Sequence, residues 1–144
     1  MSALITQDLA LRMRIDTLFA DYTHCIDDDR LEEWPDFFTP DGVYRITTRE
    51  NLSLGMPVAL VYCEGRGMMA DRVSAMRQAN IYEPHSYNHS LSALKILSVA
   101  ADGIRTQSNF AVFRTMADGA MSVFNCGRYM DRLVESDGRL LIAE

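Results

Sequence analysis

Apolar residues recur at helical spacing along the first part of the chain, and charged residues lie mostly off that stripe. The stripe consists of Leu4, Leu11, Ile15, Leu18 and Tyr22, followed by Cys25 or Ile26. This spacing predicts a long amphipathic helix over residues 4–26, with Thr6 as its N-cap. The apolar face of such a helix requires cover from the rest of the chain.

A second helix is predicted over residues 29–38, because Asp29 and Glu32 have the spacing of a capping box. The aspartate run at its start is typical of a helix cap that complements the dipole, and it lacks the ligand spacing and the glycine of an EF-hand loop. The Asp41-Gly42 turn signal then precedes a strand-like stretch, VYRITT.

The middle of the chain contains an apolar run and a third helix. Residues 58–63, VALVYC, are typical of a buried strand, and the spacing of Met69, Val73 and Met76 predicts a helix over residues 67–80. The preceding GRG lacks the remaining residues of a phosphate-binding loop, so it indicates a tight turn.

Three Asp-Gly pairs, at residues 102–103, 118–119 and 137–138, separate segments of alternating apolar and polar residues. Asp-Gly supplies the positive φ angles of tight hairpins, so a meander of four antiparallel strands is predicted from residue 85 to 144. One face of the second strand would hold Ile104, Thr106, Ser108, Phe110, Val112, Arg114 and Met116, and one face of the third would hold Met121, Val123, Asn125, Gly127, Tyr129 and Asp131. Helices first and a long sheet last predict one α+β domain, residues 1–144, in which a strongly curved antiparallel sheet wraps around the first helix.

Composition narrows the class of protein. The chain has 144 residues, 48% of them hydrophobic, which is the size of one globular domain. A net charge of -6 without any basic cluster argues against nucleic acid as a partner. No stretch resembles a signal peptide or a membrane span, so a cytoplasmic protein is expected. Its three cysteines, Cys25, Cys63 and Cys126, suit reduced and mostly buried thiols.

The stretch YEPHSYNH raises the question of a metal site, because His85 and His89 lie four residues apart. Two histidines at that spacing on a helix can bind one metal ion. Pro84 disfavours a helix here, and in a strand the two side chains would be about 13 Å apart, too far for a local chelate. His24 is the only other imidazole, so structural or interface roles are the expectation for this pair.

Three segments, CIDDDRLEEWPDFFTPDGVYRI, GRGMMADRVSAMRQANIYEPHSYNH and GRYMDRLVESDGRLLIAE, occur in this order and span nearly the whole chain. They resemble the small (beta) subunits of aromatic-ring-hydroxylating dioxygenases, and are most similar to those serving oxygenases for aromatic carboxylates such as terephthalate, anthranilate or salicylate. The resemblance implies the cone-shaped α+β fold of the ketosteroid isomerase and nuclear transport factor superfamily.

The resemblance also implies a division of labour within the enzyme. The large (alpha) subunit would carry a Rieske [2Fe–2S] cluster and a mononuclear Fe(II), three large subunits would assemble with a trimer of small ones, and the small subunit would bind no cofactor. None of the three cysteines here begins the C-x-H or C-x-x-H motif that a Rieske centre requires. This chain is therefore expected to be a structural subunit, without catalytic residues, of an oxidoreductase in aromatic catabolism.

Candidate structural or interface residues lie in the family-like motifs and combine aromatic area with directional hydrogen bonding. They are Trp34, Arg72, Arg77, Tyr82, Glu83 and His89. The alternative is that Trp34 belongs to the core and that the two arginines are solvated on the third helix. The chain ends shortly after its last Asp-Gly pair, where family members continue, so part of one sheet edge is expected to lack a partner, whether the short end is native or a truncation.

Two other functions remain open from the sequence. The same fold hosts isomerases and dehydratases, and Tyr22, Tyr44, His85 and His89 could line a cavity with Asp28 as general base. A small-ligand binding module is the second. The enzyme hypothesis requires an open cavity that contains a titrating pair, and ligand-dependent stabilisation would favour the binding module. A structural subunit instead predicts a cone filled by Met, Phe and Leu side chains.

Overall fold

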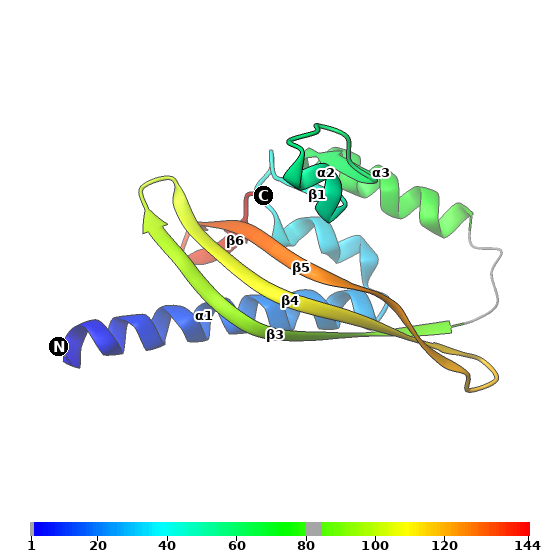
Figure 1. Ribbon diagram of the computed structural model, residues 1–144, viewed down its shortest axis with the longest axis horizontal. Helices are drawn as coiled ribbons and strands as arrows, with labels where there is room; N and C mark the ends of the chain where they lie inside the picture. The colour runs from blue at the N-terminus through cyan, green and yellow to red at the C-terminus, as the bar shows by residue number, and fades with distance from the viewer. Residues whose placement is uncertain (1, 80–84) are drawn as a thin grey trace.

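The computed structural model describes the backbone of residues 2–79 and 85–144, with side chains from Leu9 onward. A long helix lies against a curved antiparallel sheet, and shorter elements close one side (Figure 1). The elements are α1 (Ser2–Asp27), η1 (Leu31–Phe37), β1 (Val43–Ile46), α2 (Arg49–Ser53), β2 (Val61–Glu64), α3 (Gly65–Gln78), β3 (His85–Ala100), β4 (Gly103–Met116), β5 (Met121–Ser136) and β6 (Arg139–Ile142). The predicted α+β architecture is confirmed.

The main sheet has the strand order β3-β4-β5-β6, with every neighbouring pair antiparallel. Each Asp-Gly pair lies at one of its three hairpins, as predicted from the sequence. β6 pairs only with residues 133–136 of β5, so residues 121–131 of β5 have no strand partner on that edge within the part of the chain that the structure describes. β1 and β2 form a separate two-stranded sheet.

The predicted strand faces are correct over only part of β5. On β4, Ile104, Thr106, Ser108 and Val112 are buried and face the helix. Val112 pairs with Asn125 but Phe113 pairs with Val123, so β5 contains an extra residue at this point. Such a bulge transfers the following residues to the opposite face, which is why Val123 lies beside the exposed Phe113 and off the face predicted for it.

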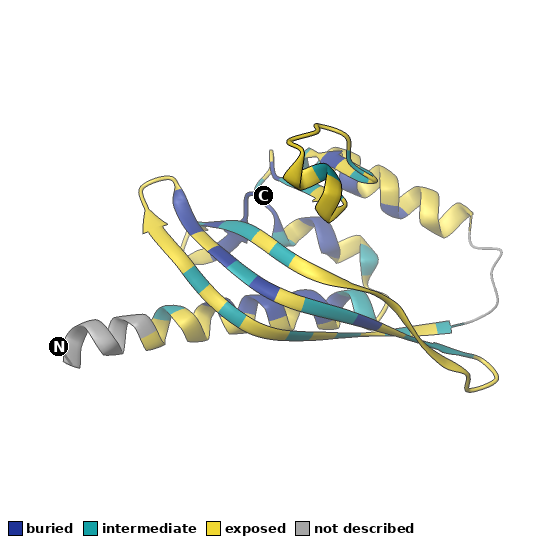
Figure 2. Cartoon of the chain, viewed as in Figure 1, coloured by how far each residue is buried: buried dark blue, intermediate teal, exposed yellow. Residues whose placement is uncertain are grey.

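The core lies between α1, η1 and the helix-side face of the sheet. Figure 2 shows buried residues gathered where these elements meet, while the ends of β3, β4 and β5 near the β4–β5 turn are largely exposed. The cluster comprises Ile15, Leu18, Phe19, Tyr22, Trp34, Phe38, Cys63, Met69, Val73, Ile104, Leu133, Leu140 and Ile142. Burial of these side chains, each contributing about 1.5–3 kcal/mol when large and apolar, holds the sheet on the helix.

The second predicted helix differs most from its expectation. The structure has a short 3-10 helix, η1, and Asp29 precedes it with φ of 60°, so the Asp29–Glu32 capping box does not form. Pro35 lies inside η1 and lacks the N–H that a longer α-helix would need. The first helix begins at Ser2, so Thr6 lies within it and is not its cap.

Three further differences concern the middle of the chain. The strand predicted over residues 58–63 begins only at Val61, and within it only Cys63 is buried. Sequence reasoning missed α2, although Thr48 is its N-cap and accepts from the Asn51 N–H, a signal present in the sequence. The third helix is confirmed as α3, and its predicted end at Asn80 lies outside the described residues.

Candidate functional site

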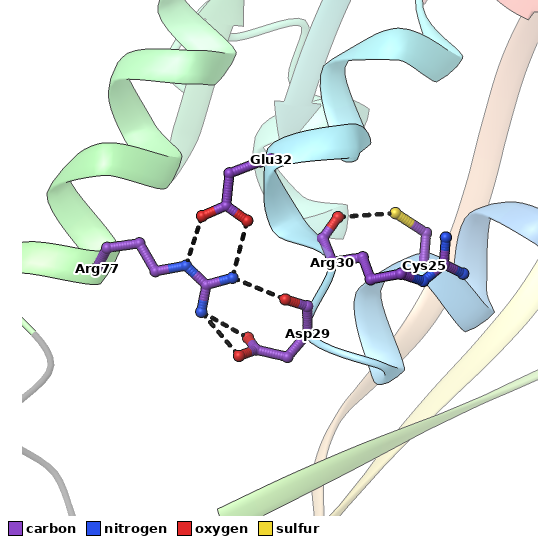
Figure 3. Close-up of polar contacts among 5 residues, drawn as sticks. All are labelled: Cys25, Asp29, Arg30, Glu32 and Arg77. Carbon is purple, nitrogen blue, oxygen red and sulfur yellow. Dashed lines mark hydrogen bonds and ion pairs between the residues drawn. The ribbon is translucent and has the colours of Figure 1, made fainter.

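Arg77, predicted as a structural or interface residue, joins α3 to η1 and to the turn before it (Figure 3). Its guanidinium donates to both carboxylate oxygens of Glu32, at 2.8 and 3.0 Å, and to the Asp29 carboxylate at 2.8 and 2.9 Å. It also donates to the Asp29 carbonyl at 2.7 Å. These hydrogen bonds lower the pKa of Glu32 and hold Asp29 in its left-handed conformation. All three of its nitrogens therefore serve a contact within the chain.

The turn before η1 also holds the side chain of Cys25 in place through a hydrogen bond. Cys25 Sγ donates to the Arg30 carbonyl at 3.0 Å (Figure 3), and burial raises the pKa of its thiol. Cys25 and Cys63 are free and buried, as predicted, while Cys126 is free and exposed.

Trp34 lies in the core, where its side chain is 7% exposed. Its indole N–H donates to the Tyr22 hydroxyl at 3.0 Å, and its ring meets Phe38 and Tyr44 edge to face. Aromatic pairs of this geometry contribute roughly 0.5–1.5 kcal/mol each beyond burial. In this chain Trp34 thus connects η1, α1 and β1.

His89 is bonded to the end of α1. Its ring Nδ1 lies 2.6 Å from Asp27 Oδ1, and its backbone N–H donates to Asp27 Oδ2 at 2.9 Å. Both side chains are about nine-tenths buried. Because a carboxylate only accepts, we assign a proton to Nδ1.

His85 and His89 both lie in β3, so the extended conformation predicted for this stretch is confirmed. The ring of His85 meets the ring of Tyr87 edge to face, with 4.8 Å between the ring centroids, at the exposed end of the sheet. Among the side chains of residues 9–79 and 85–144, no three His, Cys, Asp or Glu gather as a metal site would require.

A cluster of polar side chains lies on the helix-side face of the sheet, where the sequence analysis predicted no site. Thr106 and Asp131 are cross-strand partners, and Ser108 faces Tyr129 in the next row. Thr106 Oγ1, Ser108 Oγ and Asp131 Oδ2 are buried and have no hydrogen-bond partner among the described residues. Burial raises the pKa of Asp131 to about 7. The pKa of Tyr129 is raised as well, chiefly by burial.

The residues proposed for an enzymatic cavity do not converge. Tyr22 and Tyr44 pack within the aromatic core, whereas His85 lies at the exposed end of β3. Asp28 is on the surface, with a side chain 63% exposed and 3.8 Å from Arg30. His89 borders an open groove of about 330 Å³ between α1 and β3, beside His24 and Ser108.

Arg72 is exposed on α3, in a position where it lowers the pKa of Tyr44 against the larger effect of burial. Tyr82 and Glu83 lie outside the described residues. No helix in the described part of the chain is long and apolar enough to cross a membrane.

A long helix covered by a curved antiparallel sheet, with short helices closing one side, defines an α+β cone. The family model of the SnoaL-like domain matches residues 7–144. The chain is 40% identical over 132 residues to the anthranilate 1,2-dioxygenase small subunit of Burkholderia cepacia, covering 92% of this chain and 82% of that one. It is 39% identical to subunit beta 1 of the terephthalate 1,2-dioxygenase terminal oxygenase component of Comamonas, covering 87% and 81%.

A solved structure agrees with these sequence matches. The crystal structure assigned as the beta subunit of an aromatic-ring-hydroxylating dioxygenase from Novosphingobium aromaticivorans is 38% identical, with a TM-score of 0.86 over 94% of this chain and 86% of that one. This chain therefore belongs to the SnoaL-like family and, within it, to the small subunits of aromatic-ring-hydroxylating dioxygenases.

Proposed function

We propose that this chain is the non-catalytic small subunit of a multicomponent dioxygenase that adds dioxygen to an aromatic carboxylate during aromatic catabolism. The observation that carries the proposal is the 40% identity to an anthranilate dioxygenase small subunit across 92% of the chain. A second relative is a subunit of a terephthalate dioxygenase, and terephthalate is also an aromatic carboxylate.

The proposed role of the chain is structural. Arg77, Trp34 and the Asp27–His89 pair all bond within the chain and fix its elements to one another. A Rieske [2Fe–2S] cluster and a mononuclear Fe(II) in the large subunit would supply electron transfer and dioxygen activation. The donor sets of the described residues do not fit either group, since no three of their His, Cys, Asp or Glu side chains gather around one point and no cysteine begins a Rieske motif.

The assembly would contain three large and three small subunits in the cytoplasm, with residues 1–144 forming a single small-subunit domain. The single domain is supported by the continuous core, which joins the first helix to the last strand through Ile15, Leu133 and Ile142. Arg72, Tyr82 and Glu83 remain candidate contacts to the large subunit.

Co-expression with a large subunit whose sequence contains C-x-H and C-x-x-H motifs tests the proposal. The two chains should co-purify as a mixed hexamer, and the complex should oxygenate an aromatic carboxylate when supplied with its reductase. The complex carrying Asp131→Asn should keep its turnover, because Asp131 has no catalytic role in this proposal. Failure of any such large subunit to co-purify, together with turnover by the small chain alone, would contradict it.

A further inference from the structure

The sheet has an outer face, turned away from α1, which consists of alternate residues of β4 from Arg105 to Phe113 and their cross-strand partners on β3 and β5. The alternate residues between them face the core. Figure 2 shows that this sheet is exposed over most of its strands. The outer face therefore lacks the cover that α1 gives to the other side.

Positive charge is concentrated on the outer face. Arg105 pairs with Arg132 directly across the strands, Arg128 pairs with Asn109, and Lys95 pairs with Gln107. The only carboxylates in β3–β5 are Asp131, which is on the core side, and Glu135, which binds Arg14 of α1. A face with four cations is unexpected in a chain whose net charge is -6.

These cations are incompletely neutralised. Asp102, at the β3–β4 turn, accepts from Arg105 at 3.1 Å and offers its carbonyl to Arg132 at 2.9 Å. Lys95 and Arg128 have no ion pair within the described residues. Like charges that face each other across strands are destabilising, so an acidic surface laid on this face would relieve a cost that the isolated subunit bears.

Apolar side chains accompany the charges. Val123 is 60% exposed, Met130 is 55% exposed and Phe113 is 44% exposed, all on the outer face. Methionine, aromatic residues and arginine are the types enriched in protein interfaces. Over the nine residues from Arg105 to Phe113 the strands are about 30 Å long and about 4.8 Å apart, so the outer face presents roughly 430 Å², about half of what one partner contributes to a standard interface.

The complementary surface is the acidic segment, residues 28–36, between α1 and the end of η1. It holds five carboxylates and one cation, Arg30. Asp28 and Glu33 have side chains 63% and 57% exposed, and Asp36 is exposed as well. Arg77 neutralises part of this charge through Asp29 and Glu32, and Arg30 pairs with Asp28 at 3.8 Å and with Glu33 at 3.3 Å. Five carboxylates against these two arginines still leave the segment with net negative charge, and Asp36 has no ion pair within the described residues.

We propose that the outer face of one small subunit docks on the acidic segment of a second copy of this chain. The contact joins two different surfaces, so it is heterologous, and a head-to-tail contact of this kind closes into a ring when its rotation permits. The inference rests on the proposed function, because it assigns the surfaces that would unite the small subunits. Charge complementarity between two separate regions of one acidic chain selects a second copy as the occupant.

A charge-swap experiment tests the contact. Arg128→Glu should convert the trimer of the isolated small chain into monomer, weakening self-association at least about tenfold, as measured by sedimentation and light scattering. Glu33→Arg should do the same from the opposite surface. The chain carrying both substitutions should associate again, because the two charges are exchanged. Arg49→Glu, on α2, makes the same charge change away from both surfaces and should leave the mass unchanged.

Other outcomes of the experiment would overturn the inference. A wild-type chain that stays monomeric, or an Arg128→Glu chain that still forms trimer, overturns the inference. An Arg128→Glu chain that keeps its trimer and loses the large subunit shows that the outer face binds the large subunit instead, which also overturns it. Co-purification of the wild-type chain with the large subunit is a separate measurement. If that co-purification fails, the result contradicts the proposed function and not the contact between small subunits. Thermal unfolding of both variants checks that they are folded.

Discussion

Asp27 binds His89 through both carboxylate oxygens, one to the imidazole Nδ1 at 2.6 Å and the other to the backbone N–H at 2.9 Å. The two residues are 62 positions apart, and the contact fastens the end of α1 to β3. Because both side chains are about 90% buried, neither group has water as a ready substitute. The pair is therefore a structural connection between the helix and the sheet.

Breaking this pair should destabilise the subunit strongly. His89→Ala leaves the Asp27 carboxylate buried without its imidazole, and removal of one partner of a buried pair costs about 3–5 kcal/mol. Urea denaturation should show a loss on the order of 3 kcal/mol. His24→Ala, at an exposed position on α1, should change the free energy of unfolding by less than about 0.5 kcal/mol. Equal effects from the two substitutions would contradict the structural role.

The Arg77 contact predicts a titration change. Hydrogen bonds from Arg77 lower the pKa of Glu32, so Arg77→Met should raise that pKa toward its ordinary value near 4.3. Arg77→Lys should restore only part of the shift, because an ammonium group does not reproduce the planar fork. NMR titration of the Glu32 carboxyl measures this. Arg72→Met removes a cation from the same helix and should leave the Glu32 pKa where it is.

What the sequence predicts well is what neighbouring residues determine. The three hairpins follow from Asp-Gly pairs and the long helix from its apolar stripe, because turn geometry and periodicity are local properties. The capping box at Asp29 was wrong because Arg77, 48 residues away, takes both the carboxylate and the carbonyl of that residue. Long-range competition of this kind leaves no local signal.

The bulge near Phe124 shows the same limit within the sheet. One extra residue reverses which face Val123 occupies, and the strand pattern contains no turn residue there to indicate it. For the candidate site, the sequence correctly placed His85 and His89 in a strand, but not the bond from His89 to Asp27, which depends on how the sheet folds over α1.

Gly103 opens β4 with a φ of 137°, and a Cβ there would lie 2.6 Å from the Leu133 carbonyl oxygen. Both the backbone conformation and the close approach exclude a side chain. Gly103→Ala should therefore lower the free energy of unfolding by about 2 kcal/mol or more. Gly67→Ala, in α3 where a Cβ meets nothing within 4 Å, should be neutral or stabilising by up to about 1 kcal/mol. Thermal denaturation of both variants provides the comparison.

Asp131 predicts a pH dependence of opposite sign to that of most carboxylates. Burial raises its pKa to about 7 in the folded chain, against about 3.9 when unfolded. Between these values the folded state retains a proton that the unfolded state has lost, so the contribution of Asp131 to stability is fully present below about pH 4 and is lost as pH rises through 7. A difference of about three pKa units, at about 1.36 kcal/mol per unit, makes the loss about 4 kcal/mol.

Asp131→Asn removes the ionisation, so its stability relative to the natural chain should rise progressively from pH 4 to pH 8. Urea denaturation at intervals across that range measures the difference, which isolates Asp131 from the other titrating groups. Asp71→Asn, at an exposed position on α3, should give a curve parallel to that of the natural chain. If the curve for Asp131→Asn is also parallel to that of the natural chain, the buried carboxyl is solvated. Water then already satisfies the cluster of polar side chains that Asp131 forms with Thr106 and Ser108.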